Sequence, residues 1–565
     1  MSVPQLPLPA VLLHYAQVPP RNAVVVVAIS ALAAHMVFKR WEVMNLLVVS
    51  TLLLVLPTIV SSLLVPHFGA LQGLGLGFLI FFGTLLSSIT LYRVSPLHPL
   101  ARYPGPVLAK VSKLYHVWRI WPGKQHIYIQ RLHDRYGDMV RIGPNEVSIR
   151  DASCITPVLG AQGLPKGPMF NGRHLWPETH SLIGFRDPKE HQRRRRPWNR
   201  AFNSASVKEF NPIIQARVHE LGDALAAREG QVLDLAEWIG FFTYDFMGDM
   251  VFGGWTHMVR DGADHNGLWK LIKSGLKVAF VYEHVPWLSY YAKKLPGAGS
   301  DVKQMRAMAF GQTEKRYAAG TTSRDLFYYL GNEDGAEKAD PPKAVVMSDG
   351  VTALIAGSDT TSSVLASLFY CLLRSPEAYA RLQAEVDKFY PRGEDALDPK
   401  HIPDMQYLEA VINEGLRLFP AVPSGSQRAP EVGKGDRVVG PYFIPEGTQT
   451  RVHFWSVHRD ARNFSHPDTF WPERWLIAEG AQAQPAGFVH NANAWVPFSF
   501  GPSNCVGKNL ALQEMRMLVC HLVQRLRFRF ADGYDPAQYE RDMEDRFVVT
   551  VGRLPVVVER RDQVI

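Results

Sequence analysis

Charged side chains are nearly absent from the first 92 residues of this 565-residue chain. Only Arg21, Lys39, Arg40 and Glu42 carry charge there, and residues 43–92 carry none. A helix needs about 20 apolar residues to cross the roughly 30 Å hydrocarbon layer of a membrane. The other 473 residues hold 58 basic and 52 acidic side chains, the ordinary charge density of a soluble globular protein. The sequence therefore predicts a membrane anchor followed by a soluble body.

Three apolar stretches in the anchor are candidate membrane spans, at residues 23–38, 43–65 and 69–92. The first is the shortest, so a two-span anchor is the alternative. A cleaved signal peptide would have a basic start and one short apolar core before its cleavage site, whereas here one apolar run follows another. We therefore expect transmembrane helices that remain in the protein.

Basic residues indicate which ends of the spans face the cytosol, because Lys and Arg are enriched on that side. Lys39 and Arg40 lie between the first two spans and Arg93 follows the third, while the loop 66–68 has neither residue type. The body is therefore predicted to be cytosolic with either two or three spans. Only the side on which Met1 lies depends on their number.

Four prolines between residues 93 and 106 follow the last span. Proline fixes φ and restricts the residue before it, so we expect a stiff, extended neck. The predicted organisation is an anchor at 1–92, a proline-rich neck at 93–106 and one large domain at 107–565.

Helical patterns prevail in this domain, and the expected fold class is mainly α with small β-sheets. Apolar residues recur every three or four positions in four stretches, 124–136, 212–228, 376–389 and 407–419. Strand signals are short, at 139–149 and 438–452. Four scattered cysteines are too few for a disulfide framework, and no Cys-x-x-Cys pair indicates a zinc site.

The segment 498–511, Phe-Ser-Phe-Gly-Pro-Ser-Asn-Cys-Val-Gly-Lys-Asn-Leu-Ala, carries the strongest chemical signal. Its glycines allow a tight turn that presents Cys505 before a predicted helix at 510–518. Backbone amides at a helix N-terminus favour an anion, so Cys505 is well placed to become a thiolate, the form that ligates a metal. Taken alone, any one cysteine is more often a buried apolar residue.

Through Phe498, Gly501, Cys505 and Gly507 this segment resembles the haem-binding loop of the cytochrome P450 family. The resemblance runs from about Pro104 to near the C-terminus, with four motifs in the family's order. It implies the cytochrome P450 fold preceded by transmembrane helices, with haem b as cofactor. Cys505 would be the axial ligand of the haem iron, and Phe498 and Gly501 would belong to the cofactor-binding loop.

A second motif is structural in the family. Glu414 and Arg417 match its Glu-x-x-Arg pair, and Arg474 matches the arginine that completes a buried triad with them. An exposed ion pair three residues apart would contribute only a few tenths of a kcal/mol. Apolar neighbours along the helix favour burial instead.

The sequence Ala-Gly-Ser-Asp-Thr-Thr at 356–361 resembles the oxygen-activating part of the family's central helix. Asp359 and Thr360 are the implied catalytic pair: the acid relays protons from solvent, and the threonine steadies bound oxygen. Without a cofactor, the same polar cluster would only disturb an apolar helix.

His191 and Arg195 are similar to the family's haem-propionate contacts, and Arg428 is a further candidate. One position departs from the pattern: Ser503 stands where the family usually has Arg or His. A neutral hydroxyl cannot make a charge-assisted hydrogen bond with a propionate. The three candidates are therefore expected to hold the propionates, with weaker retention of haem.

The resemblance implies a fungal microsomal haem-thiolate monooxygenase at the endoplasmic reticulum membrane. It would insert one atom of O2 into a terpenoid, steroid or polyaromatic, in secondary metabolism or xenobiotic oxidation. No flavin or nicotinamide domain is visible, so NADPH-derived electrons would come through a separate NADPH-cytochrome reductase, with cytochrome b5 as an optional second donor. No nucleic-acid partner is expected, because no aromatic residues interleave with the arginines at 193–196.

Two alternatives are a haem-thiolate isomerase or dehydratase that needs no reductase, and a non-enzymatic haem-binding protein. The intact Asp359–Thr360 pair argues against the first, and the lack of a recognisable signalling module argues against the second. By resemblance, the substrate pocket should draw on a mainly apolar set of side chains: Phe170, Leu182, Ile183, Leu354, Ala356, residues 421–424, Phe547 and Val548.

Overall fold

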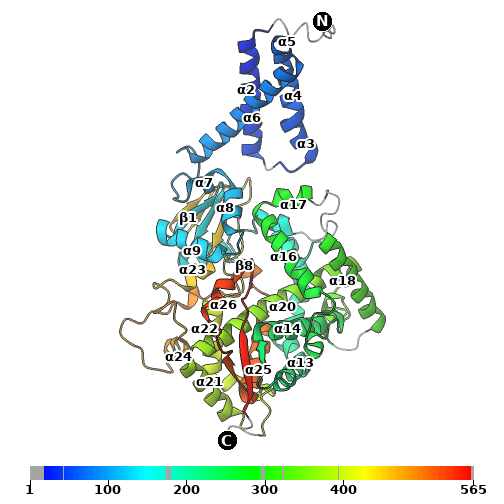
Figure 1. Ribbon diagram of the computed structural model, residues 1–565, viewed down its shortest axis with the longest axis vertical. Helices are drawn as coiled ribbons and strands as arrows, with labels where there is room; N and C mark the ends of the chain where they lie inside the picture. Colours follow the sequence, from blue (N-terminus) through cyan, green and yellow to red (C-terminus); the bar gives the residue numbers. More distant parts are fainter. Residues whose placement is uncertain are drawn as a thin grey trace. The chain divides into compact units, whose positions relative to one another are not determined.

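The computed structural model describes residues 18–41, 43–173, 180–292, 294, 300–320, 324–391 and 393–561 (Figure 1). The chain divides into two compact units between Lys113 and Leu114. Met1, whose side of the membrane depends on the number of spans, lies outside the described residues.

Three helical segments of the first unit are long and apolar enough to cross a membrane: Pro20–Arg40, Leu46–Phe68 and Ala70–Val94. Each overlaps one predicted span, and the first, the shortest in the sequence analysis, is 21 residues long. The first is helix α2 (Pro20–Arg40) and the third is α6 (Ala70–Val94). The second joins α3 (Leu46–Ser50), a π-helix (Thr51–Val55), α4 (Leu56–Ser61), a 3-10 turn (Ser62–Leu64) and α5 (Val65–Phe68).

Small residues allow α6 to approach α4 and α5 closely. A Cβ added at Gly77 would lie 2.1 Å from the Ser61 Oγ, and one added at Gly73 would lie 2.8 Å from the Val65 Cα. Glycines four residues apart bring helix backbones together in apolar surroundings, where van der Waals packing drives association. The three segments therefore form a packed bundle with its own buried residues, among them Val27, Phe81 and Leu85.

The neck is turned, and the prediction of an extended neck was wrong. Successive backbone hydrogen bonds close it: the His98 N–H donates to the Ser95 carbonyl (3.2 Å), and the Ala101 N–H donates to the His98 carbonyl (2.8 Å). Leu100 and Tyr103 are buried. Burial of these two apolar side chains stabilises the turns, and proline is compatible with turn positions because its φ is already fixed.

The second unit is mainly helical with small sheets, which confirms the expected fold class. Its helices are α8 (Lys113–Ile120), α9 (Gln125–Tyr136), α10 (Ile155–Leu159), α11 (Pro188–Ala201), α12 (Ser204–Glu209), α13 (Asn211–Ala226), α14 (Leu235–Phe252), α15 (Met258–Asp261), α16 (Leu268–His284), α17 (Pro286–Ala292), α18 (Ser300–Ala319), α19 (Leu326–Leu330), α20 (Lys343–Arg374), α21 (Pro376–Phe389), α22 (Gln406–Leu418), α23 (Phe454–His458), α24 (Glu473–Ala478), α25 (Lys508–Arg525) and α26 (Ala537–Asp542). The four predicted amphipathic stretches correspond to α9, α13, α21 and α22.

Four small sheets accompany these helices. Strands β1 (Met139–Gly143) and β2 (Glu146–Ile149) pair antiparallel, and β6 (Gln449–Val452) adds to β2 in parallel. Strand β10 (Pro555–Arg560) pairs antiparallel with both β3 (Val232–Asp234) and β7 (Leu526–Phe530). The remaining two are hairpins, β4 (Arg437–Val439) with β5 (Tyr442–Ile444), and β8 (Glu544–Arg546) with β9 (Val548–Thr550).

Helix α20 is the long central element of the second unit, and α14 packs along it (Figure 1). Two glycines make this packing close: a Cβ at Gly350 would lie 2.9 Å from the Val251 Cγ1, and one at Gly357 would lie 2.5 Å from the Met247 Sδ. The helix is continuous from Lys343 to Arg374. The polar cluster at 356–361 therefore does not break it.

Candidate functional site

The loop before α25 holds Cys505 at the wall of a cavity. The Cys505 N–H donates to the Phe498 carbonyl at 2.9 Å and closes the loop. Gly501 has φ +74°, and a Cβ there would lie 2.0 Å from the Leu159 carbonyl oxygen, so only glycine fits. Cys505 is one of four cysteines without a disulfide, and it alone among them is exposed, because it faces the cavity.

Burial by the surrounding chain raises the pKa of the Cys505 thiol above its ordinary value. The Gly507 N–H and the cations Arg195 and Lys508 act in the opposite direction without overcoming burial. The Gly507 N–H at the start of α25 thus acts in the direction expected from the sequence, toward the thiolate, while burial opposes it. A coordinated metal cation removes the proton of a thiol outright, so this environment suits a ligand that becomes charged only with its metal.

The cavity in front of Cys505 has a volume of about 390 Å³. Its wall is mostly apolar, with residues from α11, α16, α18, α20, the segment 421–428, the loop before α25 and the turn between β8 and β9. Of the pocket residues expected from resemblance, the wall contains Phe170, Leu182, Ile183, Ala356, Ala421, Val422, Phe547 and Val548. Leu354, Pro423 and Ser424 are not part of it. Phe498 lines the cavity, whereas Gly501 shapes the loop behind it.

Five basic side chains of the described residues line this cavity, and one of them, Arg173, pairs with Glu283 at 2.6 Å. The other four form a basic cluster: Lys166, His191, Arg195 and Arg428. No ion pair joins any of them to a carboxylate within the described part of the chain. Asp301, the one acid among the described residues of the wall, instead accepts a hydrogen bond from the Ser274 hydroxyl at 2.8 Å. The Arg428 Nε is buried and has no hydrogen-bond partner among the described residues.

The charges of this cluster act on one another. Burial, followed by the repulsion of Arg428 and Arg195, lowers the pKa of Lys166 to about 7. Burial, followed by Lys166, Arg195 and Arg428, lowers the pKa of His191 to about 3. Burial lowers the pKa of Arg428 to about 10. Near neutral pH, Arg195 and Arg428 therefore carry charge, Lys166 is partly protonated and His191 is neutral. Buried cations are normally paired, so this cluster is suited to a ligand with negative groups.

The four arginines at 193–196 point to different surroundings. Arg193 pairs with Glu190 at 2.5 Å in solvent, and Arg194 reaches the buried Asp349 at 2.6 Å. Arg195 donates to the Pro502 and Asn504 carbonyls at 3.2 and 2.8 Å and thereby holds the loop around Ser503. Only Arg195 of the run lines the cavity, and Arg196 is exposed.

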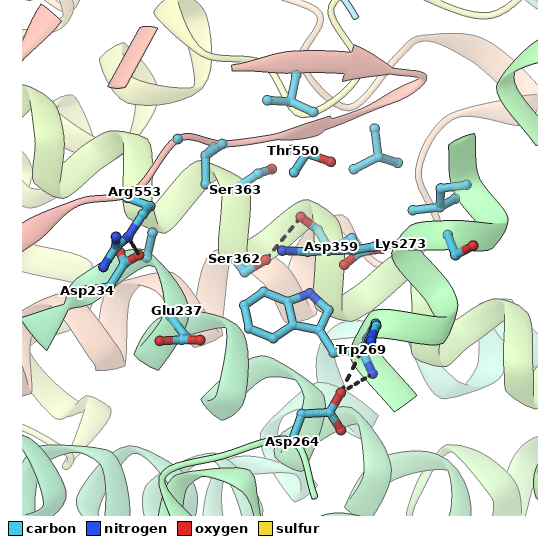
Figure 2. Close-up of a pocket in the computed structure, with 18 of the residues that line it drawn as sticks. Asp234, Glu237, Asp264, Trp269, Lys273, Asp359, Ser362, Ser363, Thr550 and Arg553 are labelled. Atoms are coloured by element: carbon cyan, nitrogen blue, oxygen red, sulfur yellow. Dashed lines mark hydrogen bonds and ion pairs between the residues drawn. The ribbon is translucent and has the colours of Figure 1, made fainter. Parts of the chain in front are cut away.

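Asp359 and Thr360, adjacent in α20, face two different cavities. Thr360 lines the cavity of Cys505, and its hydroxyl donates to the Ala356 carbonyl at 2.5 Å. Asp359 lines a second, polar pocket of about 800 Å³ formed by α14, α16, α20 and β9 (Figure 2). In the figure the carboxylate of Asp359 lies close to the ammonium of Lys273.

The pKa of Asp359 is raised toward neutral pH. Burial raises its pKa to about 6, while a hydrogen bond from the Tyr244 hydroxyl (2.8 Å) and the charge of Lys273 limit the rise. Its Oδ2 atom makes no hydrogen bond within the described residues. An acid with a pKa close to the working pH can both take up and release protons efficiently.

Glu414 is the centre of a fully buried network. It accepts hydrogen bonds from Arg417 (2.9 Å), Arg474 (3.0 Å) and the indole of Trp475 (3.1 Å), and both arginines are completely buried. Burial would raise the pKa of Glu414, but the two guanidiniums outweigh it and lower the pKa. Leu416, on the same helix, lines the cavity of Cys505, so this network supports the cavity wall.

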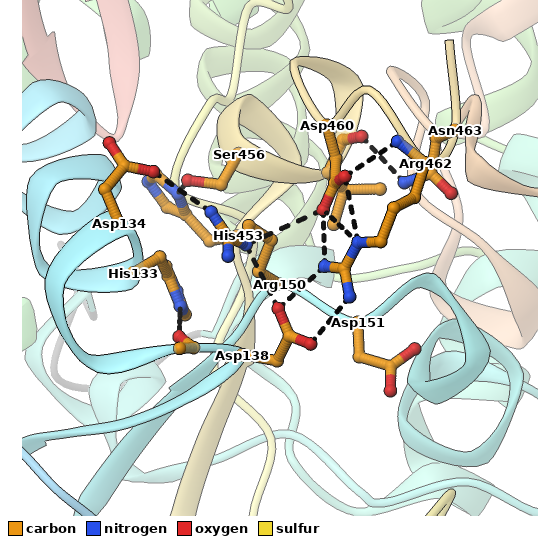
Figure 3. Close-up of polar contacts among 12 residues, drawn as sticks. His133, Asp134, Asp138, Arg150, Asp151, His453, Ser456, Asp460, Arg462 and Asn463 are labelled. Carbon is orange, nitrogen blue, oxygen red and sulfur yellow. Dashed lines mark hydrogen bonds and ion pairs between the residues drawn. The ribbon is translucent and has the colours of Figure 1, made fainter.

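A second ion network, near the surface, joins β1 to the segment after β6 (Figure 3). Arg462 pairs with Asp138 at 2.7 Å and with Asp460 at 2.5 Å, and Arg150 pairs with Asp138 at 3.1 Å. The hydrogen bond from Arg462 lowers the pKa of Asp138 to about 2, against the effect of burial. The sequence analysis missed this network because its members are distant in the chain.

Three further residues at the site were not predicted from the sequence: Lys166 and Arg173, which line the cavity of Cys505, and Tyr244, which lines neither cavity but donates a hydrogen bond to Asp359. Lys166 belongs to the basic cluster of the cavity. No local motif identifies any of the three residues, since their partners come from remote segments. A lysine flanked by Pro165 and Gly167 in a mainly apolar stretch was the only available signal for Lys166.

The fold and the site together define a class: helical proteins that hold a large anionic cofactor in front of a thiol ligand. A family model for cytochrome P450 matches residues 104–555. The chain belongs to the cytochrome P450 family, whose members have haem-thiolate iron, and its relatives are named as monooxygenases, a class of oxidoreductases.

Two relatives have comparable identity. The chain is 32% identical over 484 residues to cytochrome P450 monooxygenase FCK2 of Fusarium pseudograminearum, covering 84% of this chain and 85% of the relative. It is 31% identical over 488 residues to cytochrome P450 monooxygenase phqL of Penicillium fellutanum, covering 85% and 83%. The crystal structure of the cytochrome P450DA heme domain has the same fold, with a TM-score of 0.64 at 18% identity, covering 79% of this chain and 94% of that one.

Proposed function

We propose that this protein is a membrane-anchored monooxygenase that inserts one atom of O2 into a hydrophobic small molecule of fungal secondary metabolism. The observation that carries the proposal is the Cys505 thiol in one cavity with apolar walls and four basic side chains that lack carboxylate partners within the described residues. Haem fits this set of groups. Its carboxylates match the basic side chains, its flat apolar ring matches the apolar walls, and its iron takes a thiolate.

Each group of the cavity has a role toward the cofactor. Cys505 would ligate the iron, and Lys166, His191 and Arg428 would hold the propionates, with Arg195 mainly positioning the loop around Ser503. When bound, haem supplies the redox chemistry by which oxygen is activated. The apolar wall excludes water from the reacting groups.

In this proposal, protons are supplied by two residues that lie on different sides of α20. Asp359 would take a proton from the polar pocket and hold it on its carboxylate, next to Thr360 on the other side of the helix. The Thr360 hydroxyl donates to the Ala356 carbonyl, so its lone pairs remain available to accept a proton from Asp359 or an intervening water. This arrangement favours oxygen activation over a rearrangement that needs no protons.

Electrons would come from NADPH through a separate reductase at the endoplasmic reticulum, with cytochrome b5 as an optional donor. The exposed cations of α11, Lys189, Arg193 and Arg196, are suited to an acidic partner. Lys39, Arg40 and Arg93 at the span ends support a cytosolic body with three spans. Terpenoids, steroids and polyaromatics fit the apolar wall equally well.

The carbon monoxide difference spectrum of the reduced protein tests the proposal. The wild-type protein in microsomes should show the red-shifted band of a thiolate-ligated haem, and Cys505→Ala should lose it. A wild-type protein without the band, or a variant that retains it, would refute the assignment of Cys505.

A further inference from the structure

Arg173 lies beside apolar side chains in the cavity of Cys505, apart from the basic cluster. Arg173 ends the 3-10 helix Pro168–Arg173 and lines the cavity beside the apolar cluster of Phe170, Phe547 and Val548. Its side chain is 11% exposed. A guanidinium among apolar walls is costly to bury unless it is paired, so its partners and its unused donors indicate what it is for.

One edge of the guanidinium is fixed by the protein. The Arg173 Nε and Nη2 donate to the Glu283 Oε2 at 3.1 and 2.6 Å, and Glu283 is fully buried on α16. The guanidinium carbon lies 3.6 Å from the centre of the Phe547 ring. The Nη1 donors make no hydrogen bond to the residues that the structure describes, and Nη1 is not among the fully buried polar atoms. These donors remain available to a molecule in the cavity.

The charge of Arg173 is already balanced. Glu283 also lies 3.7 Å from the Arg451 Nη1, and Arg451 pairs with Glu146 at 2.8 Å. Arg173 and Arg451 therefore share the carboxylates of Glu283 and Glu146, and the Asp545 carboxyl also acts on Arg451. A donor whose charge is neutralised in this way binds a carboxylate no more tightly than a neutral acceptor. It therefore suits a neutral acceptor, such as a carbonyl or an amide.

The aromatic partner is held in a strained conformation. Phe547 has φ +79° in the turn between β8 and β9, a region that bulky side chains avoid. Its N–H donates to the Asp545 Oδ1 at 3.1 Å, and the other oxygen of Asp545 accepts from the Ser424 hydroxyl. Strain of this kind persists where the surroundings fix it, and it is common at ligand-binding positions. Arg173 and Asp545 together keep this ring at the cavity wall.

We propose that Arg173 is a specificity-determining residue that donates a hydrogen bond from Nη1 to a neutral acceptor on the substrate, with the Phe547 ring packed against the adjoining apolar part. The substrate class is thereby narrowed to apolar ring systems that carry a carbonyl or amide oxygen remote from the oxidised carbon. This inference rests on the proposed monooxygenase function, because it treats the cavity as the substrate site.

Matched probes test the proposal in the full-length protein in microsomes. The pairs are 4-phenylcyclohexanone with phenylcyclohexane, and androstan-3-one with androstane; the carboxylate probe is 4-phenylcyclohexanecarboxylate. Affinity is measured by the shift of the haem absorption band and, independently of haem, by the thermal unfolding midpoint. At least one ketone should bind about tenfold more tightly than its hydrocarbon, the effect of one hydrogen bond to a charged donor. If neither ketone is preferred, the proposal is overturned.

Two variants assign the preference to Arg173. Arg173→Met should remove the preference for the ketone, whereas its loss of contact with Phe547 and Glu283 should lower the affinities for ketone and hydrocarbon alike. Retention of the preference would overturn the proposal. Glu283→Gln keeps the donor but removes the neutralising charge, so the carboxylate should then gain affinity relative to the ketone. A purely structural role of Arg173 predicts no such change in the relative affinities of carboxylate and ketone. If Glu283→Gln leaves these relative affinities unchanged, the proposal that Arg173 selects neutral acceptors is overturned.

The carbon monoxide spectrum separates this proposal from the function on which it rests. A thiolate band in wild type and both variants, together with equal affinity for ketone and hydrocarbon, refutes the role of Arg173 alone. A missing band in wild type refutes the monooxygenase proposal, while the thermal shifts with the same probes still decide whether Arg173 selects acceptors.

Discussion

The two cavities beside α20 differ in the polarity and in the charge of the side chains that line them. The cavity of Cys505 is mostly apolar with a basic cluster, whereas the pocket of Asp359 is lined by side chains of both charges, including Asp234, Lys273 and Arg553 (Figure 2). Successive residues of an α-helix are rotated by about 100° around its axis. Asp359 and Thr360 can therefore belong to one motif and still line one cavity each, so the proposed proton supply and the proposed substrate site lie on different sides of α20.

The largest expected effect concerns the support of the apolar cavity. Glu414→Ala leaves Arg417 and Arg474 buried without their carboxylate, which should cost about 3–5 kcal/mol of unfolding free energy. The measurement is the unfolding midpoint of the purified protein together with its haem content. Glu409→Ala on the same helix is the control, because its pair with Arg516 is partly exposed and should be worth less than about 1 kcal/mol. Equal losses in the two variants would contradict the role of the buried network.

The second largest expected effect concerns Asp359 in the polar pocket. Asp359→Asn should slow product formation about 100-fold, since a positioned acid contributes roughly that factor. Because the carboxyl is protonated below its pKa of about 6, the Asp359-dependent rate should fall as the pH rises through 6 and above. Turnover measured from pH 5 to 9 checks this sign. A wild-type profile that Asp359→Asn leaves unchanged would show that protons arrive by another route.

A smaller effect tests the basic end of the apolar cavity. Lys166→Met removes one charge-assisted contact to a propionate, and haem should be lost to an excess of apomyoglobin about tenfold faster. Ser503→Arg should leave haem content the same or higher and should compensate for Lys166→Met in the double variant. A sharp loss of haem in Ser503→Arg would mean that the propionates are held in some other way.

The smallest expected effect concerns Tyr244, which donates a hydrogen bond to Asp359. Tyr244→Phe removes the hydrogen bond that lowers the pKa of Asp359, so the pH at which turnover falls should move upward by about half a unit. Turnover at low pH should change less than about threefold. A downward shift would contradict the assignment of Asp359 as the titrating group.

The sequence predicted what depends on neighbours along the chain. The loop of Cys505, the pair Glu414 and Arg417, and the central helix with its acid and alcohol each occupy one short segment, so their residue types and spacing are informative. The roles of Phe498, Gly501, His191 and Arg428 remain proposals that rest on their places in and around the cavity.

What the sequence could not provide depends on contacts between remote segments. Lys166 matters because an isolated β-bridge places it beside Arg428, and Arg173 matters because the turn at Phe547 packs against it. The turned neck depends on burial of Leu100, which the prolines alone do not indicate. The division of Asp359 and Thr360 between two cavities required the positions of α14 and α16.

The separation of the two cavities by α20 also bears on how such proteins diversify. Duplicated copies can exchange wall residues such as Phe170, Ile183 or Val422, and so accept new molecules, without touching the side chains around Asp359. Selection on the proposed substrate range and selection on the proposed proton supply then act on largely different positions, with Leu276 and Val548 lining both cavities. In one lineage, the residues of the apolar wall can then change rapidly while the residues around Asp359 stay under constraint.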